Sequence, residues 1–333
     1  MSYNDVLKKA RDCIGPYCKA CIECNGKVCR NQIPGPGAKG LGDVAIRNYD
    51  EWKKIRIVMD TFVEGGKADP SCTLFGHTFK YPFFAGPVGA VNLHYGDKYN
   101  DLQYNDLLVS GCAENGILAF TGDGTNPEVM KAASLAIQKV NGLAIPTIKP
   151  WNKEIIMEKM ELVKDAIAIA MDIDAAGLPF LKNMTPPAGS KSVAEMKEII
   201  DASPKPFIIK GIMSVKGALK AKEAGASGIV VSNHGGRVLD QCASTAEVLK
   251  DICDAVGNDM IVLVDGGIRS GADVFKALAM GANGVIIARP FVVSVYGDGI
   301  QEYIEKIGNE LVDTMEMCGA KTLSDITYDM IQH

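Results

Sequence analysis

From residue 81 onward, short apolar segments alternate with longer segments in which apolar positions recur at helical spacing. The longer segments include NPEVMKAASLAIQKV (126–140) and SGADVFKALAMGA (270–282). The short segments are β-branched or otherwise apolar and end in Gly, Pro, Asp, Lys or His. Eight of them predict strands: YPFFAG (81–86), GILAFTG (116–122), LAIPTIK (143–149), AIAMDID (168–174), PFIIKG (206–211), GIVVSN (228–233), MIVLVDGG (260–267) and GVIIAR (284–289).

Each predicted strand is almost entirely apolar, as expected for a parallel sheet that is covered on both faces. Eight strand-then-helix units predict an α/β fold, a closed TIM (β/α)₈ barrel over residues 81–333. A doubly wound open sheet is the alternative, but it rarely needs eight evenly spaced units, and no GxGxxG sequence opens a first helix.

Residues 1–80 precede the barrel, and we predict that they form a cysteine-rich N-terminal extension packed on it. Within the extension, NQIPGPGAKGLGD (31–43) predicts a loop, and NYDEWKKIRIVMD (48–60) predicts a helix followed by a strand. After the fourth barrel strand, NMTPPAGSKS (183–192) predicts a mobile loop.

Composition and charge narrow the class of protein. Apolar residues make up 47% and charged residues 23% of the 333 residues, a balance that can bury a large core. A net charge of −5 disfavours a nucleic-acid surface. No apolar run approaches the roughly 20 residues of a membrane span, and the first residues lack the apolar region of a secretory signal. We therefore expect a cytoplasmic protein that binds neither nucleic acid nor membrane.

Polar residues gather where the predicted strands end. In a TIM barrel these ends meet at one mouth, where active sites lie. A purely structural role would not place so many charges at equivalent positions, so the pattern predicts an enzyme. The residues are Lys149, Asp172, Asp174, Lys210, His234, Arg237, Asp265, Arg269 and Arg289.

Two neighbouring segments predict a phosphate site. DGGIRSG (265–271) places glycines directly after a strand and a serine before a helix, so that backbone N–H groups can face an anion. ARP (288–290) adds an arginine after the next strand. Loops after strands seven and eight form the usual phosphate site of this barrel. Tight turns and helix caps are the alternative explanation.

The segment SNHGGRVLD (232–240) is an unusual end for an apolar strand. His234 can accept a proton near neutral pH, and Arg237 carries a planar fork that suits a carboxylate. Asp174 could orient the imidazole and stabilise its charged form. A lone histidine here would more often be a turn residue, but the neighbouring arginine favours a catalytic pair.

Lys210 ends the fifth strand and needs an anionic partner if it is buried. The negative N1–O2 region of a reduced flavin would be such a partner. A Schiff-base lysine is the alternative, but the His-Gly-Gly-Arg sequence gives it no particular support.

These segments together resemble the family of FMN-dependent α-hydroxy-acid dehydrogenases and oxidases, which includes glycolate and lactate oxidases. The resemblance is strongest over residues 206–292, weaker over 45–205 and absent from the cysteine-rich start. It rests on SNHGGRVLD (232–240), DGGIRSGADVFKALAMGANGV (265–285), ARPF (288–291), PFIIKGI (206–212) and GPVGA (86–90).

The resemblance implies a role for each matching residue. His234 would be the base that activates the substrate, with Asp174 beside it, Arg237 would bind the substrate carboxylate, and Lys210 would face the flavin. Gly267, Arg269 and Arg289 would hold the FMN phosphate. The implied set of FMN-binding residues is Pro87, Val88, Gly89, Thr121, Thr147, Lys210, Ser232, His234, Asp265, Gly266, Gly267, Arg269, Ala288 and Arg289.

The sequence departs from the family on the substrate side. Thr147-Ile148-Lys149 stands where the family usually has Gln-Leu-Tyr, so a substrate-binding tyrosine is absent and Lys149 takes its place as a cationic contact. The segment AAGLPF (175–180) lacks the second substrate-facing arginine of the family. The flavin site is thus preserved while the substrate pocket differs, and the substrate's side chain stays open.

Half of the ten cysteines lie in CIGPYCKACIECNGKVC (13–29). The C-x₂-C-x₂-C core is typical of iron–sulfur binding, and two CxxC steps could instead hold zinc. The predicted ligands are Cys18, Cys21, Cys24 and Cys29, with Cys13 as the alternative fourth ligand. Free thiols, or a disulfide formed in air, are the structural alternative.

The sequence therefore predicts an FMN-dependent oxidoreductase that oxidises a small 2-hydroxy acid, similar to lactate or glycolate, to the 2-oxo acid. Because members of the family are commonly tetramers, the resemblance implies a homotetramer. Two other functions stay open: an FMN-dependent isomerase of the type 2 isopentenyl diphosphate isomerase kind, and a flavin redox sensor that uses the cysteines.

Overall fold

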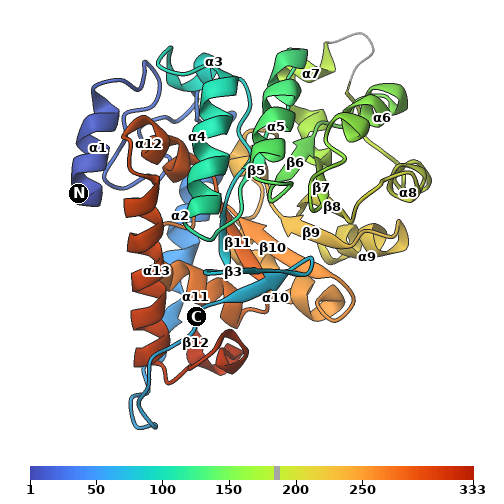
Figure 1. Ribbon diagram of the computed structural model, residues 1–333. Coiled ribbons are helices and arrows are strands. Elements are labelled where there is room, and N and C mark those ends of the chain that lie inside the picture. Colours follow the sequence, from blue (N-terminus) through green and yellow to red (C-terminus); the bar gives the residue numbers. More distant parts are fainter. Residues whose placement is uncertain (184–187) are drawn as a thin grey trace.

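The structure, a computed structural model, describes residues 1–183 and 188–333. Residues 184–187, which belong to the segment predicted to be a mobile loop (183–192), lie outside the described residues. Eight parallel strands form the centre of the molecule (Figure 1), in the order β4-β11-β10-β9-β8-β7-β6-β5. A parallel bridge between Ala85 and Ala119 brings β4 back to the chain that leads into β5, which closes the ring. The predicted TIM barrel is confirmed.

Each barrel strand overlaps one of the eight predicted segments. The strands are β4 (Phe83–Ala85), β5 (Phe120–Thr121), β6 (Ile145–Ile148), β7 (Ile169–Asp172), β8 (Phe207–Ile212), β9 (Gly228–Val231), β10 (Ile261–Asp265) and β11 (Gly284–Ile287). Nearly all their residues are buried. This explains why the strand sequences are continuously apolar and do not alternate between apolar and polar residues.

A helix follows each strand and covers the outside of the barrel (Figure 1). These helices are α4 (Asp101–Glu114), α5 (Pro127–Lys139), α6 (Lys153–Leu162), α8 (Val193–Asp201), α9 (Val215–Glu223), α10 (Thr245–Val256), α11 (Gly271–Ala279) and α13 (Ile300–Met317). Shorter helices lie in the loops at the carboxyl ends of the strands: α3 (Val91–Tyr95), η1 (Ile173–Gly177), α7 (Pro179–Lys182), η2 (His234–Gly236) and α12 (Arg289–Tyr296). Two single turns, η3 (Leu323–Asp325) and η4 (Tyr328–Met330), follow α13.

Local sequence signals set where several helices begin. Ser192 and Ser244 start α8 and α10 with reciprocal capping bonds to Glu195 and Glu247, which satisfy backbone N–H groups that the helix leaves free. Pro127 occupies the first turn of α5, where its missing N–H costs nothing.

The apolar core has two layers. One fills the barrel interior and includes Phe84, Phe120, Ile208, Val230 and Leu263. The other packs the outer faces of the strands against the helices. An antiparallel hairpin of β2 (Cys72–Leu74) and β3 (His77–Phe79) adds Leu74 and Phe79 to the inner layer. The hairpin therefore closes the end of the barrel opposite the predicted site.

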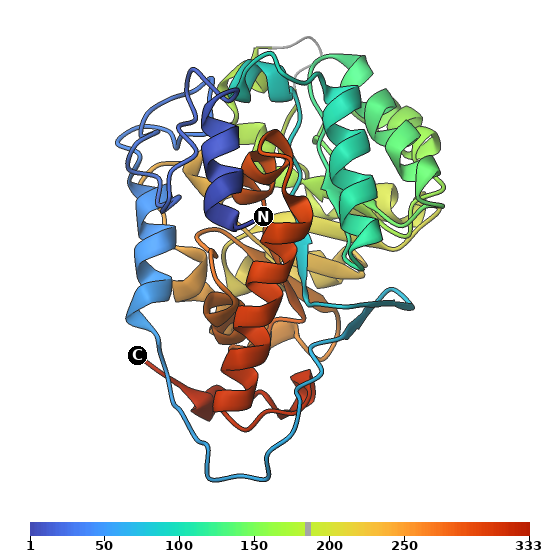
Figure 2. The same cartoon turned by 60° about the vertical axis from the view of Figure 1, so that its left-hand side comes forward.

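Besides the β2–β3 hairpin, two helices of the first 80 residues contact the barrel. Helix α1 (Tyr3–Arg11) packs against α12 and α13, as Figure 2 shows, and α2 (Asp43–Lys54) packs against α10 and η2. Strand β1 (Arg56–Ile57) pairs antiparallel with β12 (Ile331–Gln332) near the end of the chain. The helix-then-strand prediction for residues 48–60 is confirmed, whereas a division of the chain at residue 80 stays a prediction.

Helix α2 lies directly against the predicted phosphate loop. The Trp52 indole N–H donates to the Gly266 carbonyl at 2.8 Å. A Cβ added to Gly267, whose φ is +80°, would lie 1.9 Å from the Asn48 carbonyl oxygen, so only glycine fits there.

Within the described residues, none of the helices has the length and apolar character to cross a membrane.

Candidate active site

A cavity of about 330 Å³ opens where the barrel strands end. Residues at or near the carboxyl ends of five strands line it: Lys149, Asp172, Lys210, Asp265 and Ala288. The volume lies within the range of about 300–1,000 Å³ that is typical of small-molecule sites. The cavity therefore lies where the active site of a TIM barrel is expected, at the carboxyl ends of the strands.

Most residues that the resemblance implies for FMN line this cavity. They are Pro87, Val88, Gly89, Thr147, Lys210, His234, Asp265, Gly266, Gly267, Arg269, Ala288 and Arg289. Thr121 and Ser232 do not line it, although both are buried. The Ser232 hydroxyl accepts a hydrogen bond of 2.8 Å from Lys210 Nζ, so Ser232 lies just behind the cavity wall.

Buried polar atoms around the cavity indicate that it is built for a polar ligand. Thr147 Oγ1, Asp265 Oδ1 and Arg289 Nη1 are buried without a hydrogen-bond partner among the described residues. Such orphaned groups are rare and costly unless a ligand or water satisfies them. A planar ring system with a ribityl phosphate tail would meet an apolar wall, donors and acceptors along the ring edge, and two arginines at the tail. The residues present therefore fit FMN.

Lys210 is buried and surrounded by acidic groups. Its Nζ lies 3.3 Å from Asp265 Oδ2. Burial alone would lower the pKa of Lys210, but Asp265 and Asp174 outweigh it, so the net pKa lies above the ordinary value. The side chain is therefore a permanent cation on the cavity wall, and the Schiff-base alternative, which needs a neutral amine, is disfavoured.

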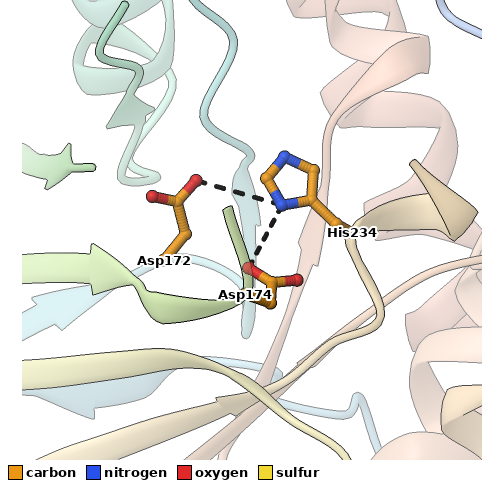
Figure 3. Close-up of side chains that lie close together, drawn as sticks. All are labelled: Asp172, Asp174 and His234. Carbon is orange, nitrogen blue, oxygen red and sulfur yellow. Dashed lines mark hydrogen bonds and ion pairs between the residues drawn. The ribbon is translucent and has the colours of Figure 1, made fainter. Parts of the chain in front are cut away.

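His234 and two aspartates form a compact group (Figure 3). His234 Nδ1 lies 3.2 Å from Asp174 Oδ1 and 4.0 Å from Asp172 Oδ2, while its other ring nitrogen points away from both carboxylates. The three side chains are 17%, 12% and 2% exposed, respectively. This arrangement leaves Nε2 free to meet a ligand while Nδ1 is held by Asp174.

The local sequence explains how His234 reaches this position. It lies in the single turn η2 directly after β9, and three consecutive residues, His234, Gly235 and Gly236, have positive φ values. A Cβ on Gly236 would approach the Ala38 Cβ to 2.9 Å. The two glycines therefore allow a sharp left-handed turn beneath the extension, which is the reason that the apolar strand ends in His-Gly-Gly-Arg.

Burial and charge set the protonation states of this group. Burial lowers the pKa of His234 below its ordinary value, although Asp174 acts in the opposite direction. Burial would raise the pKa of Asp174, but His234 and Lys210 outweigh it and the net pKa is lowered. Near neutral pH, His234 is therefore a neutral imidazole beside an ionised carboxylate, the state that a general base requires.

Asp172 carries a second partner, since its carboxylate forms an ion pair with Lys149 Nζ. Asp172, Asp174 and His234 are also the only group of three or more potential metal ligands, among the described residues, whose ligand atoms lie within 4.8 Å of one another. The positive charges of Lys149 and Lys210 disfavour a metal cation there. Lys149 lines the cavity, where the sequence predicts a substrate contact.

Arg237 links the cavity to the N-terminal extension. Its Nη1 donates to the carbonyl oxygens of Gly35 and Gly37, at 2.5 and 3.0 Å. Nε and Nη2 have no partner among the described residues, which leaves one edge of the guanidinium for a ligand. Burial lowers the pKa of Arg237, but an arginine stays charged at neutral pH.

Some residues of the cavity are absent from the sequence predictions. His94 and Tyr95, in α3 after the first strand, line it, as do Gly35 and Pro36 of the extension. His94 Nδ1 accepts a 2.9 Å hydrogen bond from the Gly35 N–H, and burial lowers the pKa of His94 to about 4, so its ring is neutral. His94 could have been found as a histidine in a strand-end loop. The Pro/Gly segment 31–43 was predicted only as a loop, without contacts to the site.

Comparisons with known proteins agree with this geometry. The family model of the FMN-dependent dehydrogenases matches residues 36–183 and 180–333. The peroxisomal (S)-2-hydroxyacid oxidase GLO3 of Arabidopsis thaliana is 28% identical over 320 residues, which are 86% of this chain and 87% of that protein. The L-lactate oxidase of Roseobacter sp. is 42% identical, over 140 residues that span 41% of this chain and 38% of the relative.

Among solved structures, a putative lactate oxidase of Pediococcus acidilactici superimposes with a TM-score of 0.78 at 24% identity. The match covers 98% of this chain and 92% of the other. At this level of identity the likeness shows the shared fold. Of the three functions left open by the sequence, the comparisons favour the oxidoreductase.

Proposed function

Because the chain belongs to the FMN-dependent dehydrogenase family, we propose that it oxidises a small 2-hydroxy acid to the corresponding 2-oxo acid. The family match makes FMN the cofactor and oxidation–reduction the class of reaction. Relatives named as acting on 2-hydroxy acids and lactate support the substrate class.

One observation carries the proposal: a histidine and an arginine share the cavity that most of the residues implied for FMN line. His234 and Arg237 lie three positions apart and both face the same space. A 2-hydroxy acid offers a carboxylate and an adjacent carbinol, so a substrate held by Arg237 places its reacting group near His234. This matches the reaction better than either residue does alone.

In the proposed reaction, each residue of the cavity has a distinct role. The free edge of Arg237 binds and orients the carboxylate. Nε2 of His234 accepts one proton as the carbinol is oxidised, and Asp174 stabilises the imidazolium through Nδ1. FMN, when bound, supplies the chemistry that takes up the two electrons of the oxidation. Lys210 holds positive charge at the cavity wall where the ring would lie.

Lys149 distinguishes this pocket from the family pattern. It lies in the cavity as a partner of Asp172, within reach of the space between Asp172 and His234. We assign it a substrate contact, in which it exchanges part of its interaction with Asp172 for an oxygen of the substrate. Lys149 thereby adds a second cation to a pocket that already contains Arg237.

The reaction is tested by product formation. The purified flavoprotein is incubated with a panel of 2-hydroxy acids and an artificial electron-accepting dye, and the 2-oxo acid is quantified. We expect one acid to give one 2-oxo acid per two electrons transferred to the dye. Absence of any 2-oxo acid, with FMN fully bound, would contradict the proposed reaction.

The pH dependence follows from the lowered pKa of His234. The base is active only when it is neutral. As the pH is lowered from 7, kcat/KM should therefore stay constant at first and should begin to fall only below the ordinary histidine pKa of about 6.5. In Asp174→Asn the carboxylate that raises the His234 pKa is lost, so the acidic limb should move to still lower pH. The lost charged hydrogen bond, worth about 1.5–3 kcal/mol, should lower kcat about 10- to 150-fold.

The control for this variant is Asp259→Asn, which removes a surface ion pair with Lys222 and should leave the profile unchanged. An Asp174→Asn profile whose acidic limb moves to higher pH would show that Asp174 does not act on His234 as proposed.

The homotetramer and the cytoplasmic location expected from the sequence stay proposals. The resemblance to a family whose members are commonly tetramers supports the first. Light scattering of the purified protein should give four times the chain mass of 35.6 kDa. A monomer at micromolar concentration would contradict it.

A further inference from the structure

A second cavity lies between the N-terminal extension and the barrel and has a volume of about 280 Å³. Four cysteines line it: Cys18, Cys21, Cys24 and Cys29. All four lie in the loop between α1 and α2, which has no regular secondary structure (Figure 2). The four cysteines, spaced C-x₂-C-x₂-C-x₄-C, thus line one cavity and are not scattered over the surface.

The fifth cysteine of the segment is placed differently. Cys13 does not line this cavity, and its thiol donates to the Tyr296 carbonyl oxygen at 3.2 Å. Of the five cysteines in the segment, four therefore line the cavity, whereas Cys13 does not and contacts the barrel at Tyr296. This removes the ambiguity about the fourth ligand that the spacing alone leaves open.

The positions of the thiols distinguish between metals. Tetrahedral zinc, with Zn–S bonds of about 2.3 Å, holds its sulfurs about 3.8 Å apart. In the part of the chain that the structure describes, no three cysteine sulfurs lie within 4.8 Å of one another. A metal–sulfide cluster interposes its own core between the thiolates and holds them farther apart than one ion does. Four thiols around an open cavity therefore suit a cluster better than zinc.

The charges around the cavity suit an anionic group. Arg269, Arg289, Lys53 and Lys306 line it together with the cysteines. Arg269 donates to the Cys24 carbonyl at 2.8 Å, and its Nη2 lies 3.7 Å from Cys24 Sγ.

A thiol becomes a thiolate when it coordinates a metal, and neighbouring cations then offset the negative charge. The cavity supplies these cations.

We propose that Cys18, Cys21, Cys24 and Cys29 bind an iron–sulfur cluster in this second cavity. The C-x₂-C-x₂-C core provides three thiolates from one short loop, as in ferredoxin-type sites, and Cys29 provides the fourth. The site needs no residue from another chain, and it does not depend on which acid the enzyme oxidises.

The cluster site adjoins the FMN cavity. Pro36, Arg269 and Arg289 line both cavities, so the two arginines implied for the FMN phosphate also face the cysteines. Arg269 Nη2 lies 3.7 Å from Cys24 Sγ on this shared wall, and sulfur atoms of iron–sulfur clusters accept such hydrogen bonds. Binding of the cluster and of FMN should therefore support each other through these arginines.

The proposal is tested by chemical analysis of anaerobically purified protein, after incubation with ferrous iron, sulfide and a thiol reductant. We expect iron and acid-labile sulfide in equal molar amounts, with a broad visible absorbance that remains after FMN is removed. Cys21→Ser should lower both iron and sulfide at least tenfold. Cys13→Ser is the matched control, because it changes a cysteine of the same segment outside the cavity, and should retain both.

The FMN content separates a lost ligand from a misfolded chain. Among the described residues, Arg269 contacts Cys24 and not Cys21, so Cys21→Ser should keep at least part of its FMN while losing the cluster. Stoichiometric zinc in place of iron, or neither metal after reconstitution, would overturn the proposal. Full iron and sulfide in Cys21→Ser, or an equal loss in Cys13→Ser, would overturn the ligand assignment.

Discussion

His234→Asn is expected to lower kcat by about 10²- to 10⁴-fold while FMN stays bound, because the substitution removes the proposed base, which takes the substrate's proton. Asparagine retains a polar side chain beside Asp174, so the pocket loses its base without gaining an unpaired buried carboxylate. The measurement is anaerobic single-turnover reduction of the flavin by substrate, which reports the chemical step without a contribution from reoxidation.

Two readouts make this prediction specific. The flavin spectrum and the FMN-to-protein ratio of the variant should equal those of the original protein, since Lys210, Arg269 and Arg289 are unchanged. His77→Asn, at an exposed histidine on the β2–β3 hairpin, should leave kcat unaltered. A His234→Asn enzyme that retains more than about a tenth of the original rate would show that another group is the base.

The second large effect is expected for Arg237→Lys. A lysine can place one charge but cannot bind Gly35 and Gly37 and also present a planar edge to a carboxylate. The loss of a buried charged contact costs about 2–5 kcal/mol, so kcat/KM should fall by at least about 30-fold. Most of this loss should appear in KM, because Arg237 binds the substrate in the ground state as well as in the transition state.

Binding of the 2-oxo acid product, followed by the flavin spectrum, should weaken in parallel with KM. Arg47→Lys, which alters an exposed pair with Glu247, is the matched control and should leave kcat/KM within a factor of two or so. If Arg237→Lys changed kcat alone and left product binding intact, its proposed role in holding the carboxylate would be wrong.

The barrel could be predicted because its signal is repeated. Each strand is buried on both faces, so the sequence shows eight apolar runs that no surface strand would show. The β2–β3 hairpin and the pairing of β1 with β12 were not predicted, although a strand was expected within residues 48–60, where β1 lies. These strands are only two or three residues long, too short to show a clear apolar pattern. The pairing of β1 with β12 also joins segments far apart in the sequence, which local patterns do not report.

The centre of the site could also be predicted, for a related reason. In a barrel the carboxyl ends of the strands converge, so a polar residue at the end of an apolar run can be placed at the mouth of the barrel. Lys149, Lys210, His234 and Arg237 were placed in this way, and all of them line the cavity. The roles assigned to them stay predictions until the variants are measured.

The parts of the site that were not predicted lie in loops and not at the strand ends. The Gly35–Gly37 backbone contacts Arg237, some 200 residues away, through carbonyl oxygens that every residue type possesses. The pairing of Asp172 with Lys149 depends on the neighbouring positions of β6 and β7 and on side-chain lengths. Contacts of these kinds need the folded geometry.

The most direct test of the central claim is an anaerobic titration of the purified protein with 2-hydroxy acids, followed by the flavin absorbance. The account predicts that one acid bleaches the oxidised flavin bands completely, with one 2-oxo acid formed per FMN, and that His234→Asn stays oxidised on the same time scale. Protein that contains FMN but is not bleached by any acid of the panel, in either form, would contradict it.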